Sequence, residues 1–97
     1  MAYTLSRKAE EDIIAIFLDG AGQFGLQQAE RYHSLLENTF QFLADNPLAA
    51  RERLELIPPV RIHPIESHLV LYSIDESGDI FIIRVRHGHE DWLTNTG

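Results

Sequence analysis

The fold is decided by the stretch Ala29-Glu-Arg-Tyr32-His-Ser-Leu-Leu36-Glu-Asn-Thr-Phe40-Gln-Phe-Leu43. Its five numbered residues are spaced three or four positions apart, over about four turns of an α-helix. This spacing puts an apolar stripe on one helical face, so the stretch must pack against a second layer. Asn46 and Pro47 are expected to end the helix, because proline cannot continue it.

A first helix is predicted upstream, after a short strand over residues 2–5. Ser6 is a suitable N-cap, so the helix should begin near Arg7. A stripe at helical spacing follows, made of Ala9, Ile13, Ile16 and Phe17. Glu10, Glu11 and Asp12 are explained by attraction to the positive end of the helix dipole. Gly20 and Gly22 are expected to end this helix.

Three strands are predicted downstream, over residues 60–65, 68–74 and 79–86. The turns between them, 66–67 and 75–78, carry residues typical of hairpins. Residues 47–59 contain three prolines, which predicts an irregular connection that can hold a short helical turn. The expected order is β-α-α-β-β-β: an α+β fold with a helical hairpin on one face of an antiparallel meander.

Alternation along the last strand assigns its two faces. Phe81, Ile83 and Val85 are expected to face the helices. The opposite face would carry Ile80, Ile82, Arg84 and Arg86. Arg61 and His63 alternate in the same way, so a suitable register would bring them onto the open face with Arg84 and Arg86.

Composition and charge limit the class of protein. The 97 residues have room for one domain, spanning 1–97, and contain no cysteine, which excludes a disulfide-stapled scaffold and suits the cytoplasm. No signal peptide or membrane-spanning run is found. Eight basic and 15 acidic residues give a net charge of -7, which argues against broad nucleic-acid binding and favours a protein partner.

Several stretches, taken in order, match one known pattern. They are Tyr3-Thr-Leu-Ser6 with Ala9 and Asp12, Gln28-Ala29 with Tyr32, Leu43-Ala-Asp-Asn-Pro47 with Arg51, Arg61, His68-Leu-Val-Leu-Tyr72, and Ile82-Ile-Arg-Val-Arg-His-Gly-His-Glu-Asp91. Together they resemble the ParE branch of the RelE/ParE toxin superfamily, through about Trp92. The resemblance implies a bacterial type II toxin that is neutralised by a ParD-like antitoxin in a hetero-oligomer and inhibits growth by acting on DNA gyrase.

The resemblance also points to site residues. The family carries a run similar to Arg-x-x-His-Gly-Arg-Arg-Asp after its last strand, which Arg84, His87, Gly88 and Asp91 match. His89 and Glu90 depart from it and lower the positive charge there. The expected partner- and target-binding residues are Arg61, Arg84, Arg86, His87, His89, Asp91 and Trp92. The arginines, the histidines and Trp92 each have a structural alternative: solvated ion pairs for the arginines, strand-end packing for the histidines, and a cap on the core for Trp92.

Two other functions stay open. A RelE-like, ribosome-dependent mRNA endonuclease would use Arg61, Arg84 and either His87 or His89, but one lysine and an acidic chain suit RNA cleavage poorly. A degenerate, non-toxic binding partner would explain the departures at His89 and Glu90. We expect an inhibitor without bond-breaking chemistry, with no catalytic residues and no cofactor. His87, His89 and Asp91 have metal-ligand chemistry, yet nothing in the sequence fixes a geometry, so no metal site is expected.

Overall fold

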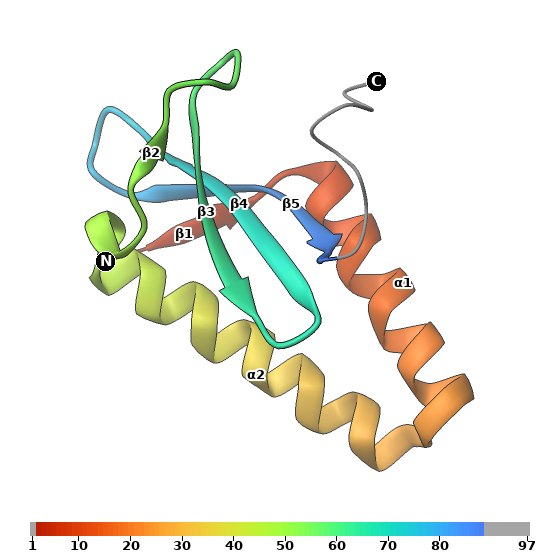
Figure 1. Ribbon diagram of the computed structural model, residues 1–97. Helices are drawn as coiled ribbons and strands as arrows, with labels where there is room; N and C mark the ends of the chain where they lie inside the picture. Colours follow the sequence, from red (N-terminus) through yellow and green to blue (C-terminus); the bar gives the residue numbers. More distant parts are fainter. Residues whose placement is uncertain (1, 89–97) are drawn as a thin grey trace.

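The computed structural model describes residues 2–88 (Figure 1). The elements are β1 (Tyr3–Leu5), α1 (Arg7–Phe24), α2 (Leu26–Asp45), the 3-10 turn η1 (Pro47–Ala49), β2 (Glu52–Arg53), β3 (Val60–Ile65), β4 (His68–Ile74) and β5 (Ile80–His87). One sheet contains all five strands in the order β1-β5-β4-β3-β2; β1 is parallel to β5 and the other pairs are antiparallel. The predicted α+β fold is confirmed, and β2 is added within the connection that was expected to be irregular.

The core lies between the helical hairpin and one face of the sheet. Its largest fully buried side chains are Tyr72, Phe40, Leu36, Leu43, Ile80, Ile82 and Val70. The predicted stripe of α2 therefore does face the sheet. Tyr72 also closes the end of this layer: its hydroxyl donates to the Pro47 carbonyl at 2.8 Å and accepts from the Ala50 amide at 3.3 Å. Within residues 2–88, neither helix is long and apolar enough to cross a membrane.

The two helices meet at a single residue, Gly25. Its φ of +93° is a conformation that L side chains rarely adopt, and this breaks the helix. The predicted end of α1 at Gly20 and Gly22 is wrong, because α1 continues to Phe24. A Cβ added at Gly20 would lie 3.6 Å from the Cβ of Ala29, an ordinary van der Waals contact, so the packing of the hairpin does not require glycine at this position.

A β-bulge in β5 overturns part of the predicted face assignment. Tyr72 pairs with Ile82, whereas the preceding residue Leu71 pairs with Arg84, so Ile83 is an extra residue. Ile80 and Ile82 are fully buried, whereas Phe81 is 38% exposed, the reverse of the prediction. After the bulge the predicted assignment of the two faces is correct, because Val85 lies in the core.

Candidate functional site

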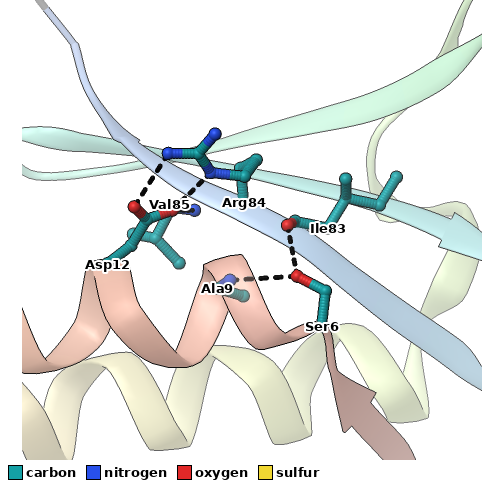
Figure 2. A network of polar contacts seen from close by, with 6 residues as sticks. All are labelled: Ser6, Ala9, Asp12, Ile83, Arg84 and Val85. Carbon is teal, nitrogen blue, oxygen red and sulfur yellow. Dashed lines mark hydrogen bonds and ion pairs between the residues drawn. The ribbon is translucent and has the colours of Figure 1, made fainter.

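Arg84, the first residue of the family-like motif, is held by an ion pair across the fold (Figure 2). Its Nε donates to Oδ2 of Asp12 at 2.7 Å, and its Nη2 donates to Oδ1 at 2.9 Å. The two side chains are only 26% and 17% exposed. Asp12 also accepts the backbone N–H of Val85 at 3.0 Å. The Asp12 carboxylate thus binds both the Arg84 guanidinium and the Val85 amide, and this fixes α1 against β5.

Ser6 makes a second junction between α1 and β5, beside the first. Its backbone N–H donates to the Ile82 carbonyl at 2.9 Å, and its hydroxyl donates to the Ile83 carbonyl at 2.6 Å. The same hydroxyl oxygen accepts from the Ala9 amide at 2.9 Å, which is the predicted N-cap (Figure 2). Where β1 ends, the start of α1 continues the hydrogen bonding along the edge of β5.

These contacts change the interpretation of two residues. Helix-dipole complementarity and solubility explain Asp12 in the sequence, whereas in the structure its carboxylate also joins α1 to β5. The guanidinium of Arg84 is held by Asp12 within the chain, and a role of Arg84 toward a partner or target stays a prediction. Local sequence patterns cannot predict this ion pair, because Asp12 and Arg84 are 72 positions apart.

The predicted cluster of arginines on one open face is wrong. Arg61 pairs across the sheet with Tyr72, and Arg84 pairs with Leu71. Consecutive residues of a strand point to opposite faces, so Arg61 and Arg84 lie on opposite sides. His63 lies on the helical side too, where its ring contacts Phe42 at a centroid distance of 5.9 Å.

Arg61 itself has a local role. Its Nη1 donates to the Ala50 carbonyl at 2.6 Å, which joins β3 to the segment after η1. Tyr72 binds the same segment through the Ala50 amide. The contacts of Arg61 thus stabilise the connection between the helices and the sheet.

His87 lies at the end of β5, beside His68. The two ring centroids are 5.2 Å apart with an interplanar angle of 70°, and the Nδ1 of His68 lies 2.6 Å from the hydroxyl of Tyr32. Tyr32 comes from α2, so the chain of contacts ties that helix to β4 and β5. Burial raises the pKa of Tyr32 above its usual value near 10, so the phenol keeps its proton to a higher pH than an exposed tyrosine. The sequence predicted the packing of His87 but not these partners.

Replacing Tyr32 with phenylalanine is expected to lower the free energy of unfolding by about 1 kcal/mol at neutral pH. The variant loses the contact with His68 and the weaker bond from its hydroxyl to the Ile65 carbonyl at 3.3 Å. Because the folded-state pKa is raised, this contribution is present below about pH 10 and is lost as the pH rises through the folded-state value. Urea unfolding from pH 7 to 11 measures it. Tyr3→Phe is the control, and an equal loss there would contradict the assignment.

The remaining predicted site residues fall into two groups. Arg86 is partly exposed and pairs across the sheet with Leu69, on the face opposite the core. Gly88 follows β5 and donates its N–H to the Ser67 carbonyl at 2.8 Å; a Cβ there would lie 3.3 Å from that oxygen. His89, Asp91 and Trp92 lie outside the described residues. Within residues 2–88, no group of three or more His, Asp or Glu side chains is placed to hold a metal.

A surface that was not predicted lies between the helices, beside β1. We call it the hairpin groove and define it by Glu10, Ile14, Phe17, Leu18, His33 and Glu37. The groove has two adjoining hollows of about 330 and 240 Å³, which share Ile13, Ile14 and His33. A signal was present in the sequence: Ile14 and Leu18 widen the apolar stripe of the first helix beyond what one core face needs.

Comparison with known proteins identifies relatives of this chain in sequence and in fold. A family model described as "ParE toxin of type II toxin-antitoxin system, parDE" matches residues 3–92. Two curated proteins named Toxin ParE1, from two strains of Mycobacterium tuberculosis, are each 30% identical over 89 residues, which is 92% of this chain and 91% of theirs. A solved structure of the chromosomal ParDE TA system from P. aeruginosa has the same fold, with a TM-score of 0.75 and 22% identity over 90% of this chain and 95% of that one. The chain therefore belongs to the ParE toxin family of type II toxin-antitoxin systems.

Proposed function

We propose that the chain is a cytoplasmic toxin that inhibits DNA gyrase and is neutralised by a ParD-like antitoxin. The observation that carries this proposal is the family match, which runs from β1 through the end of β5. Inhibition would come from binding, without bond-breaking chemistry of its own. The net charge of -7 supports a protein target over an extended nucleic-acid surface.

The arrangement of the arginines favours an inhibitor over a ribonuclease. The ribonuclease hypothesis needs Arg61 and Arg84 to act together with a histidine, because a catalytic site requires groups that converge on one reacting centre. These two arginines lie on opposite faces of the sheet, and contacts within the chain engage both guanidinium groups. Of the proposed target-binding residues within residues 2–88, Arg86 is partly exposed on the face opposite the core and His87 is exposed at the end of β5.

The test is a gyrase supercoiling assay with purified protein, run beside mRNA cleavage in a translation extract. We expect loss of supercoiling with intact mRNA, and restored supercoiling when the cognate antitoxin is added first. Codon-specific mRNA cleavage with normal supercoiling would overturn the proposal in favour of a ribonuclease. Inactivity in both assays, together with unimpaired growth on expression, would indicate a binding partner that has lost toxicity.

Arg86→Glu is expected to weaken gyrase inhibition about 5- to 150-fold, since reversing a charge at an interface costs about 1–3 kcal/mol. The measurement is the protein concentration that halves supercoiling. The matched control is Arg51→Glu, which makes the same change in net charge at an exposed residue before β2. Equal loss in both variants would show that overall charge, and not Arg86, determines inhibition.

A further inference from the structure

We propose that His68 and His87 form a two-histidine site for a divalent transition-metal ion, with Zn²⁺ as the ion to test. The two residues stand directly opposite each other on β4 and β5, and their ring centroids are 5.2 Å apart. Imidazole nitrogen is a ligand that suits zinc, copper and nickel, whereas magnesium and calcium prefer oxygen. Metal binding is a property of the folded chain and does not depend on gyrase being the target.

The β-bulge in β5 sets this pair of histidines. Before the bulge, β4 and β5 are in a register that joins Tyr72 to Ile82. Continued without the extra residue, that register would put Arg86 opposite His68. The extra residue shifts β5 by one position, so His87 takes that place. The sequence alone could not join His87 to His68, because their pairing depends on this irregularity.

The separation of the two rings suits one shared metal ion. Zinc binds imidazole nitrogens at about 2.0–2.1 Å, in a tetrahedral arrangement. Two imidazoles that share such an ion have ring centroids about 5 Å apart. His68 and His87 show this separation, with an interplanar angle of 70°. The fold thus sets the two rings at the spacing of a chelate, so binding needs little movement of the strands.

Tyr32 favours the tautomer of His68 that a metal requires. Its hydroxyl donates to the Ile65 carbonyl at 3.3 Å, and its oxygen lies 2.6 Å from the Nδ1 of His68. A phenol has one proton and a carbonyl only accepts, so both contacts are satisfied together when Nδ1 donates to the phenol oxygen. The lone pair of the neutral imidazole then lies on Nε2, the nitrogen that would bind the ion. Histidine ligands of metals commonly donate their other ring N–H in this way.

The surroundings of the pair allow an ion to enter. His87 is exposed and His68 is partly buried, at the end of the sheet beside α2. The net charge of -7 attracts cations to the chain. Within residues 2–88, no third His, Asp or Glu side chain completes a larger cluster. Water would fill the other coordination positions, so we expect weaker binding than at a zinc site with four protein ligands.

Titration calorimetry of the 97-residue chain with zinc chloride tests the site. We expect one ion per chain, bound about tenfold or more weakly by His68→Ala and by His87→Ala. The matched control is His63→Ala, because His63 packs against Phe42 and should change the dissociation constant less than about threefold. Circular dichroism shows whether each variant is folded. No binding at about a tenfold molar excess of zinc, or equal binding by all variants, would overturn the inference.

Nuclear magnetic resonance of the histidine rings tests the same pair without a substitution. In the metal-free chain, we expect His68 to be the Nδ1–H tautomer. On addition of zinc chloride, we expect the ¹⁵N resonances of Nε2 of His68 and of one ring nitrogen of His87 to shift together. Shifts of His87 and His89 with His68 unchanged would overturn the pair and assign the metal to the segment after β5.

Tyr32→Phe separates the positioning role of the hydroxyl from simple packing. The variant removes the acceptor of the His68 Nδ1–H, so zinc binding is expected to weaken about tenfold while the population of the Nδ1–H tautomer falls. Tyr3→Phe is the control and should change neither quantity. An unchanged tautomer and unchanged zinc affinity in Tyr32→Phe would overturn the role given to Tyr32.

Discussion

Ile82→Ala is expected to lower the free energy of unfolding by about 2–5 kcal/mol, whereas Ile83→Ala should cost less than about 1 kcal/mol. Ile82 is completely buried in the core, and its truncation removes packed methyl groups and leaves a cavity. Ile83 is the extra residue of the bulge and is only partly buried. Urea unfolding of the two variants, followed by circular dichroism, measures the difference between adjacent residues of the same type.

The pair supplies its own control, because both changes delete the same atoms from one strand. Uninterrupted alternation through β5 would give the reverse order, with the larger loss at Ile83. Equal losses would place both side chains in comparable surroundings and contradict the bulge. Retained binding to the antitoxin by Ile83→Ala would show that the outer residue can be truncated without disturbing the fold.

The bulge could not have been predicted from the pattern because β5 is apolar on both faces near its start. Ile80-Phe-Ile-Ile83 contains no polar residue that would show which side chains face solvent. The sequence therefore fits two assignments of the buried face equally well. Where one face was polar, prediction succeeded: the stripe from Ala29 to Leu43 gave α2 and its buried face. Ser6 was likewise found from its residue type, since an N-cap depends on neighbours only three positions away.

The candidate site was less predictable than the fold, because its contacts join distant parts of the chain. The resemblance proposes Arg84, Asp91 and the histidines as site residues, but it supplies residue types and not their partners. The Tyr32–His68 contact spans 36 positions and depends on how α2 crosses the hairpin of β3 and β4. The shared face proposed for Arg61 and Arg84 failed because it required a register between three strands that sequence alone does not set.

Asp12→Ala is expected to destabilise the fold by about 2–4 kcal/mol, more than any other single change at an acidic residue of α1. The substitution leaves the Arg84 guanidinium in a largely buried position without its carboxylate, and removes the acceptor of the Val85 amide. Glu11→Ala is the control, because this exposed neighbour shares the charge and the helix but not these contacts. Thermal and urea unfolding of both variants measure the difference.

Asp12→Asn and Arg84→Ala separate the two roles of this carboxylate. Asparagine keeps an oxygen that can accept the Val85 amide but loses the charge, so the stability of Asp12→Asn should fall between those of the unmodified chain and Asp12→Ala.

In the double variant Asp12→Ala/Arg84→Ala, the loss of unfolding free energy should be smaller than the sum of the single losses by about 1–3 kcal/mol, because each single change already breaks the ion pair. Additive losses would show that the pair contributes nothing, and would return Arg84 to the residues available for a partner. With coupling, Arg84→Glu is expected to lower the amount of folded protein through repulsion from Asp12, whereas Arg86→Glu leaves the Asp12–Arg84 ion pair intact.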